Sequence, residues 1–186
     1  MSLSYAQAPR PLGGPVSFTL EGDRLTVDSG RKVQEVRLGA VEQVRMTYEP
    51  RSFSRKAFRT RVRMKDGKSF TFSSLHWKSL IEAESLDAEY RTFTRALLAA
   101  IAAANPGARF VAGRPLWAWV AATLLGAVSL LAMALFVHRA LSAGHTSAAG
   151  LGAFFFLAAL WQVAPFIRLN RPRAFRPEAP PAALMP

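Results

Sequence analysis

A row of cations between positions 51 and 65 is the part of this sequence with the clearest capacity for chemistry. Arginine or lysine recurs at every second position from 59 to 65, and side chains spaced in this way project from one face of an extended strand. Between positions 51 and 68 only Asp66 is acidic. Like charges on one face repel, so the row is destabilising unless something anionic covers it. The candidate binding residues are Arg51, Arg55, Lys56, Arg59, Arg61, Arg63 and Lys65.

Three kinds of surroundings fit such a row. Anionic lipid headgroups attract cations near the bilayer by ~1 kcal/mol each, and an acidic protein surface offers similar complementarity. The third is water, with the arginine stems covering apolar surface of the sheet. The net charge of +12 favours an anionic partner. No nucleic-acid partner is expected, because no aromatic platform is interleaved with the cations.

Other chemistries lack the residues they need. Cysteine is absent, and the three histidines, His76, His138 and His145, do not lie at metal-ligand spacing from a carboxylate or from another histidine. The carboxylates stand mostly at predicted turns and on the predicted helix surface, with no pair placed for acid–base work. No glycine-rich phosphate loop is present. We therefore expect a protein that is not an enzyme and has no metal or cofactor.

Two apolar runs near the end of the sequence predict a transmembrane hairpin over residues 116–168. The first run, 116–137, contains no charged residue, and the second, 148–167, has Gln162 as its one strongly polar side chain. A helix of roughly 20 apolar residues crosses ~30 Å of hydrocarbon. A pair of helices buried in a soluble bundle is the alternative, but such helices normally carry a polar stripe.

The residues that flank these runs predict interfaces and orientation. The predicted membrane-interface residues are Trp117, Trp119, Trp161, Arg114 and Arg168. Cations gather before the first run and after the second, whereas the connecting segment, 138–147, has only Arg139. Both termini are therefore expected on the cytoplasmic side of an inner membrane. Residues 1–30 lack an apolar h-region, so no signal peptide is expected. The predominance of arginine and alanine is compatible with a GC-rich bacterial genome.

The residues before the hairpin have the pattern of an α+β domain over residues 16–107. Apolar residues alternate with polar ones through position 72, which predicts about six antiparallel strands with turns at Gly22-Asp23 and Asp66-Gly67. Period 3.6 follows and ends at Asn105-Pro106-Gly107. The helix start is left open between a capping box of Ser79 with Glu82 and a cap at Ser85 or Asp87. One helical face carries Leu86, Tyr90, Phe93, Leu97 and Ile101.

The segments outside these elements are predicted to lack regular structure. Residues 1–15 contain three prolines and two glycines and are predicted to be a flexible arm. Residues 169–186 are rich in proline and are predicted to be a disordered tail. The expected soluble fold is an antiparallel sandwich or partly open barrel capped by one C-terminal helix.

The pattern of residues 16–105 resembles a bacterial pleckstrin-homology-like (PH-like) domain. The resemblance is carried by the Glu21-Gly22-Asp23 turn, the step 38–44, the Lys65-Asp66-Gly67-Lys68 hairpin and the helix through Tyr90. Small membrane proteins of this kind pair such a domain with transmembrane helices, and most lack an assigned function. The resemblance implies seven strands, whereas six are counted here. It also implies a basic first hairpin in members that bind phosphoinositides, whereas here that turn holds Glu21 and Asp23 with only Arg24 basic, so the inositol-phosphate site of those members does not carry over.

These observations together predict a membrane-anchored binding or scaffold module without enzymatic activity. Its basic domain is expected to contact anionic lipid headgroups or an acidic protein partner. The alternative is an accessory or assembly subunit of a larger integral membrane complex, in which the hairpin makes the main contact and the basic face lies against another subunit.

Overall fold

The chain folds into two units, one rich in β-structure and one made of two long helices. The computed structural model describes residues 2–11, 13–50 and 56–186. Unit 1 comprises Met1–Gly113 together with Arg173–Pro186, and unit 2 comprises Arg114–Pro172. This confirms a mixed α+β architecture in which two helices are long and apolar enough to cross a membrane.

A four-stranded antiparallel sheet in the order β1-β2-β3-β4 begins unit 1. Gly22 has a φ of +59°, as the predicted turn between β2 and β3 requires, because L-residues with a side chain rarely adopt this conformation. The sheet corrects the prediction that residues 1–15 are a flexible arm. Residues 2–7 instead pair along their whole length with β2, because the alternate side chains of Tyr5 and Gln7 are buried. The strands are β1 (Ser2–Gln7), β2 (Val16–Glu21), β3 (Arg24–Asp28) and β4 (Val33–Arg37).

A second sheet has the order β11-β10-β5-β6-β7. Strands β5, β6 and β7 form an antiparallel meander, and the predicted hairpin turn at Gly67 is confirmed by a φ of +83°. Strand β10 pairs with β5 in the parallel direction, and β11 pairs with β10 antiparallel. The bounds are η1 (Leu38–Ala40), β5 (Val41–Pro50), β6 (Lys56–Met64), β7 (Ser69–Ser73), β10 (Arg109–Ala112) and β11 (Arg173–Ala174).

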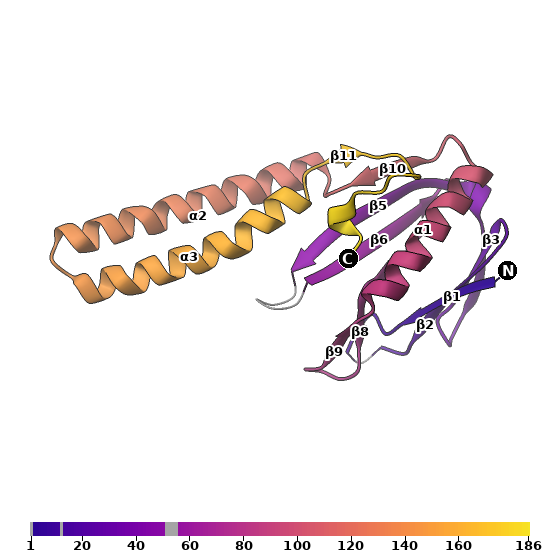
Figure 1. The fold of residues 1–186 in the computed structure, drawn as a ribbon, viewed down its shortest axis with the longest axis horizontal. Coiled ribbons are helices and arrows are strands. Elements are labelled where there is room, and N and C mark those ends of the chain that lie inside the picture. The colour runs from indigo at the N-terminus through magenta and orange to yellow at the C-terminus, as the bar shows by residue number, and fades with distance from the viewer. Residues whose placement is uncertain (1, 12, 51–55) are drawn as a thin grey trace. The chain divides into compact units, whose positions relative to one another are not determined.

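Helix α1 (Asp87–Ala104) lies alongside β1 and packs on it (Figure 1). The predicted apolar face is confirmed from Tyr90 to Ile101, whose side chains are fully buried. The helix begins at Asp87, so the capping box of Ser79 with Glu82 is not its start. Those two residues instead close the turn between β8 (Leu75–Trp77) and β9 (Ala83–Ser85), a small hairpin outside both larger sheets.

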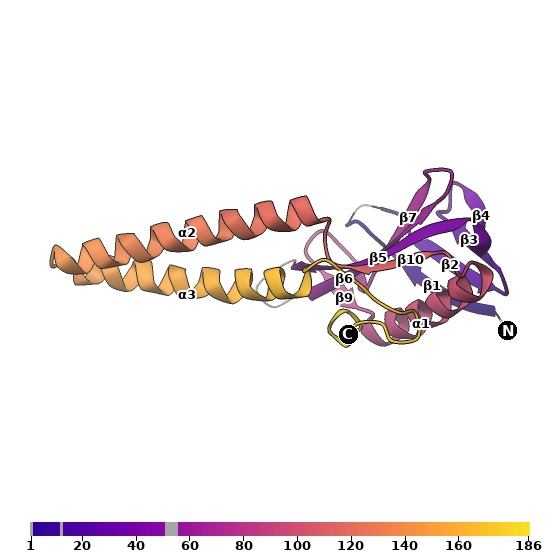
Figure 2. The same cartoon turned by 90° about the horizontal axis from the view of Figure 1, so that it is seen from above.

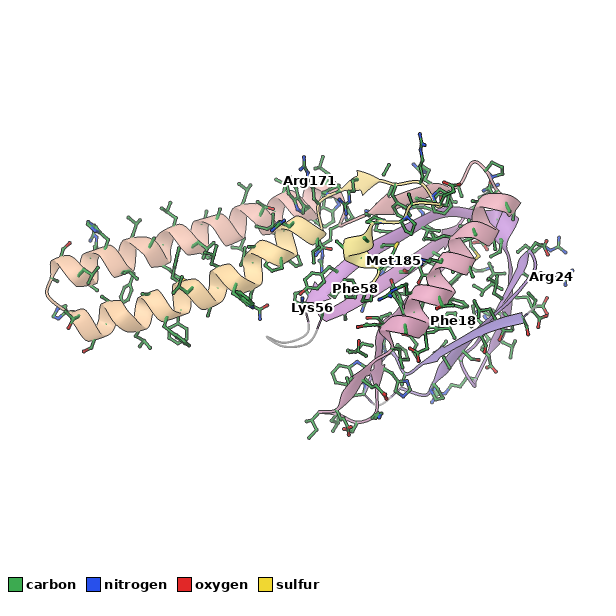
Figure 3. All side chains as sticks on the ribbon, viewed as in Figure 1. Phe18, Arg24, Lys56, Phe58, Arg171 and Met185 are labelled. Carbon is green, nitrogen blue, oxygen red and sulfur yellow. The ribbon has the colours of Figure 1, made fainter. Side chains whose placement is uncertain are left out.

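Five aromatic side chains form the centre of the domain core. Tyr5 from β1 stacks on Phe93 of α1 with a centroid distance of 5.4 Å, and Phe72 from β7 meets Phe93 edge to face at 5.3 Å. Phe18, labelled in Figure 3, adds β2 to the cluster, and Tyr90 adds a second turn of α1. The cluster therefore joins the first sheet, the second sheet and the helix. Such aromatic pairs contribute about 0.5–1.5 kcal/mol beyond the area that they bury.

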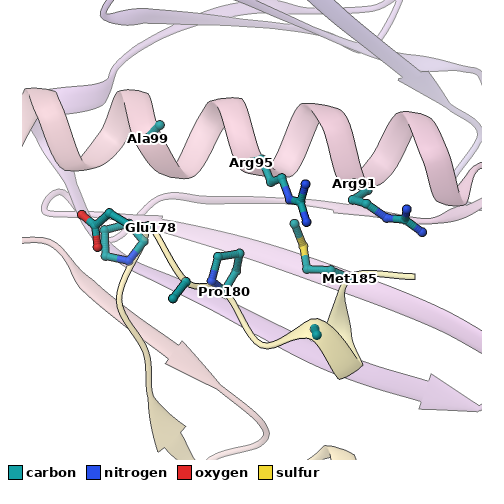
Figure 4. A pocket seen from close by; sticks show the side chains of 9 residues that line it. Arg91, Arg95, Ala99, Glu178, Pro180 and Met185 are labelled. Carbon is teal, nitrogen blue, oxygen red and sulfur yellow. The ribbon is translucent and has the colours of Figure 1, made fainter.

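The C-terminal segment is folded, which corrects the prediction of a disordered tail over residues 169–186. Residues 173–174 form β11, and the segment ends in η2 (Ala182–Leu184) beside β5. Leu184 is fully buried and Met185 nearly so, because these two side chains pack into the domain. Arg95 of α1 points toward Met185 across a cavity that Arg91 also lines (Figure 4), and the Arg91 Nε donates a hydrogen bond to the main-chain oxygen of Pro186.

Unit 2 is an antiparallel helical hairpin of α2 (Leu116–Ser142) and α3 (Thr146–Leu169), visible in Figure 2. Both helices extend beyond the apolar runs, so the predicted linker over residues 138–147 shortens to three residues. Gly144 supplies the positive φ, +78°, that the tight turn needs. Side chains such as Leu125 and Phe154 are exposed on the hairpin, as expected of surfaces that face lipid.

Glycines let the two helices approach closely. A Cβ atom added at Gly126 would lie 3.0 Å from a methyl group of Val163, and one added at Gly152 would lie 3.0 Å from Phe136 and Val137. Gly126, four residues after Ala122 in a small-residue spacing that lets helices approach closely, therefore lies inside the packing of this hairpin. Gly150 differs, because nothing lies within 4 Å of an added Cβ there.

Replacement of Gly152 by leucine should destabilise the hairpin, whereas Gly150→Leu should not. Both changes add the same side chain to α3, but only the first forces it into α2, at a cost of about 1–3 kcal/mol for overpacking. Thermal unfolding of the detergent-solubilised protein, followed by size-exclusion chromatography after heating, would measure the difference. Equal thermal stability of the two variants would contradict the helix contact.

The C-terminal segment should be required for full stability of unit 1. Because Ala112 and Arg173 are cross-strand partners, a short Gly/Ser turn can replace residues 114–172 and leave the domain intact. This linked domain should be soluble and unfold at a higher temperature than residues 1–113 alone. Leu184→Ala in the linked domain should lower the free energy of unfolding by about 2–5 kcal/mol, measured by urea denaturation. Ala183→Ser, at an exposed neighbouring position, is the control.

Candidate functional site: a basic sheet face

The predicted cation row lies on the outward face of β6. Thr60 and Val62 are fully buried, whereas Arg61 and Arg63 are exposed and Arg59 is half-buried, so the strand alternates as predicted. Neighbouring strands place two more arginines on this side of the sheet. The resulting set, here called the basic face, comprises Arg45 of β5, Arg59, Arg61 and Arg63 of β6, and Arg109 of β10.

Two carboxylates partly neutralise the basic face. Glu42 accepts hydrogen bonds from Arg63 at 2.9 Å and from Arg109 at 2.5 Å, and these two guanidinium groups lower the pKa of its carboxyl. Glu49 forms an ion pair with Arg59 at 2.9 Å. The prediction treated the row as an unpaired set of like charges. In the structure, by contrast, Arg59 and Arg63 form ion pairs with carboxylates of β5, the strand next to β6.

Arg45 and Arg61 form a pair of like charges that repel each other within the basic face. They are direct cross-strand partners on β5 and β6, a pairing in which like charges are unfavourable. Arg45 is half-buried, and its Nη1 donates to the carbonyl oxygen of Gly113 at 2.9 Å. Its burial, followed by the charges of Arg63 and Arg61, lowers its pKa. Within the described residues, no carboxylate lies within ion-pair distance of Arg61, which leaves this guanidinium group open to solvent.

The other predicted site residues do not join the basic face. Lys56 is two positions before buried Phe58 on β6, so the two side chains share the face of the strand opposite to the basic face. Lys65 follows the end of β6, in the turn, where its Nζ lies 3.4 Å from the carbonyl oxygen of Gly39. Arg51 and Arg55 lie outside the described residues.

Sequence reasoning missed Arg45 and Arg109 as members of the site. The alternation of Arg45 with Val44 and Met46 placed it on an outward strand face, but nothing in the sequence paired that face with Arg61. Arg109 belongs to β10, whose parallel pairing with β5 joins residues more than sixty positions apart. No local pattern reports such a contact.

A cavity beside the basic face is also lined by arginine. Arg59 lies on its wall together with Arg10 from the β1–β2 loop and Arg31 from the β3–β4 turn, and Trp77 is a further neighbour. Aspartate and glutamate are absent from the described residues that line it. The loop that carries Arg10 is the true first hairpin of the domain, because the turn with Glu21 and Asp23 joins β2 to β3.

His76, Thr60 and Tyr90 have structural partners. The Nδ1 atom of His76 accepts a hydrogen bond from the backbone N–H of Ala8 at 3.1 Å, which links β8 to the end of β1. The hydroxyl groups of Thr60 and Tyr90 lie 2.7 Å apart in the core, where burial raises the pKa of Tyr90. Among the described residues, no group of three or more His, Cys, Asp or Glu is arranged to hold a metal ion.

Four of the five predicted interface residues lie near the end of the helical hairpin where α2 begins and α3 ends. Trp117 is exposed at the first turn of α2, whereas Trp119 lies between the helices and donates its Nε1–H to the carbonyl oxygen of Ile167 at 2.9 Å. The Arg114 guanidinium lies 5.1 Å from the Phe166 ring centroid, within the range of a cation–π contact. Arg168 is exposed at the end of α3. These four residues lie at the same end of the hairpin.

Trp161 lies within α3, eight residues before the end of the helix. It is two residues from Val163, which packs against Gly126, and Gly126 is ten residues into α2. At 1.5 Å per residue this level is about 15 Å from the start of the helix. In a ~30 Å hydrocarbon layer that begins near Trp117, Trp161 therefore lies close to mid-depth.

Comparison of the chain with models of protein families, with curated proteins and with solved structures finds no significant match.

The ion pairs of Glu42 should make stability depend on pH below neutrality. Because the folded-state pKa is lowered, this carboxylate contributes stability that is fully present above its unfolded pKa of about 4.3 and is lost as the pH falls through the folded value. Glu42→Gln should therefore lower the melting temperature of the linked domain at pH 7, and the gap to the parent should close on acidification. Glu35→Gln is the control, since its ion pair with Arg24 is exposed and longer, 3.8 Å. A gap that stays constant with pH would contradict the assignment.

Proposed function

We propose that this protein is a non-enzymatic, membrane-anchored binding module whose basic face contacts anionic lipid headgroups. The observation that carries the proposal is the arrangement of Arg61 between Arg45 and the two carboxylate-bound arginines of β6. Five arginines share the face with two carboxylates, so an excess of positive charge remains after every ion pair has formed.

The charge of the domain as a whole supports an anionic surface as the partner. Residues 1–114 carry 19 Lys and Arg against 11 Asp and Glu. Each cation near an anionic leaflet is attracted by ~1 kcal/mol, and the attraction falls off within a Debye length of about 8–10 Å. A domain that is covalently joined to a membrane hairpin needs only weak attraction to be oriented, because its local concentration at the surface is high.

The PH-like resemblance is part of the proposal, and the strand order supports it. Strands β1–β4 and β5–β7 form meanders of four and three strands, and α1 follows them after the small β8–β9 hairpin. The two meanders together reach the count of seven strands that the resemblance implies once β1 is included. The β1–β2 loop, which is the first hairpin of the domain, carries Arg10, whereas Glu21 and Asp23 belong to the second.

We further propose that the hairpin crosses a bacterial inner membrane with both termini in the cytoplasm. The cations that flank the hairpin, including Arg114 and Arg168, lie at the ends of α2 and α3 where the chain enters and leaves unit 1. By the positive-inside rule that end faces the cytoplasm, where the inner leaflet supplies the anionic lipid.

Arg61 offers a sharper test of the basic face than the whole row. Removing Arg59 or Arg63 would leave Glu49 or Glu42 with a lost partner, so a change in binding would be mixed with a change in stability. Arg61→Gln removes one cation that has no carboxylate partner among the described residues. Arg24→Gln removes one cation from the other sheet, where its side chain extends outward (Figure 3), and gives a variant of equal net charge.

Arg61→Gln in the linked domain should weaken binding to vesicles that contain anionic phospholipid by about fivefold, the equivalent of ~1 kcal/mol. Arg24→Gln should change binding much less, and added salt should weaken the parent more than the Arg61 variant. Vesicle co-sedimentation at several salt concentrations would measure each effect. Equal loss in both variants would mean attraction by net charge alone. No binding by the parent would favour an acidic protein partner over lipid.

A further inference from the structure

We propose that the tip of the β8–β9 hairpin, Leu80 and Ile81, inserts into the surface of the bilayer that the chain's own helices enter. This proposal concerns a different part of unit 1 from the basic face. It depends on apolar burial, so it stands or falls separately from the proposed headgroup contact.

The tip exposes two adjacent large aliphatic side chains. Leu80 is 65% exposed and Ile81 is 88% exposed. In the described part of unit 1, Val33 on β4 is the other large apolar side chain exposed to this extent, at 62%. Adjacent aliphatic residues at a turn form a small exposed hydrophobic patch. Such patches mark surfaces that contact a membrane or another molecule.

The chemistry of the turn gives no local reason for these residues. Leu80 and Ile81 are the two central residues between Ser79 and Glu82, positions at which Gly, Pro, Asn or Asp usually supplies the turn conformation. The turn is closed by its flanks instead. The N–H groups of Lys78 and Ser79 donate to the Glu82 carbonyl oxygen at 3.0 and 3.2 Å, and the Glu82 N–H donates to the Ser79 Oγ at 3.1 Å.

These hydrogen bonds suit the residues that flank the tip to an apolar surrounding. A backbone N–H that already has a partner can leave water without the cost of an unsatisfied donor. The base of the tip is electrically balanced, because Lys78 and Glu84 form an ion pair at 2.8 Å. Trp77, half-buried at the end of β8, provides an amphipathic ring of the kind favoured at the headgroup layer.

A bilayer fits this tip better than a protein partner does. Stable protein interfaces bury about 800 Å² on each side, far more than two side chains at a turn provide. Lipid requires no such area, and it is always near: unit 1 joins the membrane hairpin directly through the Gly113–Arg114 and Pro172–Arg173 peptide bonds. Because Glu82 is exposed beside the tip, insertion should not depend on anionic lipid.

The absence of cysteine allows a direct test on the full chain. Leu80→Cys carries a unique thiol for a polarity-sensitive fluorophore, and Val33→Cys is the matched control at another exposed aliphatic position. The protein is reconstituted into vesicles of zwitterionic phosphatidylcholine, with and without bromine on the acyl chains. We expect blue-shifted emission and quenching by brominated lipid at position 80, and neither at position 33.

A second variant separates insertion of the tip from an affinity of the dye for lipid. Ile81→Ser in the Leu80→Cys background should reduce the quenching, because the remaining apolar side chain of the tip is lost. Equal quenching at positions 33 and 80, or no effect of Ile81→Ser, would overturn the proposal. So would an unquenched label at position 80 in vesicles of both zwitterionic and anionic composition. Quenching at position 80, together with unchanged vesicle binding of the Arg61→Gln variant, would support insertion of the tip and contradict headgroup contact by the basic face.

Discussion

The antiparallel pair of β10 and β11 is the constraint on which the architecture depends. It brings the strand before the helical hairpin and the strand after it side by side in one sheet, with Ala112 and Arg173 as partners. The two ends of an antiparallel helical hairpin lie close together, and this pair provides the matching spacing within unit 1. The same pairing covers the edge of β10, which would otherwise present unpaired backbone groups.

The aromatic cluster joins the two sheets and α1 inside unit 1. A β-meander of four strands and another of three each have one apolar face, and neither is stable while that face meets water. Tyr5, Phe18 and Phe72 from the sheets meet Tyr90 and Phe93 of α1, so the helix closes both faces at once. Strand β1 belongs to this closure, which explains why residues 2–7 are ordered.

The positive charges of the basic face are partly neutralised by two carboxylates on the same sheet. Glu42 and Glu49 lie where they bind three of the five arginines, which lowers the cost of holding the cations on adjacent strands. Arg61 remains outside these ion pairs, directly opposite the half-buried Arg45. A face with this balance can be stable without a partner and still attract an anionic one.

The sequence by itself determined the features that depend on neighbours along the chain. Period two and period 3.6 located most strands and the buried face of α1, glycine marked the turns at Gly22 and Gly67, and unbroken apolar runs located the two long helices. Only the tertiary structure decided which segments meet. Residues 2–7 and 173–186 are rich in small, polar or proline residues, and their order comes from partners far away in sequence, as the burial of Tyr5 and Leu184 illustrates. The basic face has the same origin: its alternation on β6 is local, but the pairing of Arg61 with Arg45 and of Glu42 with Arg109 arises from strand register, which local patterns do not encode.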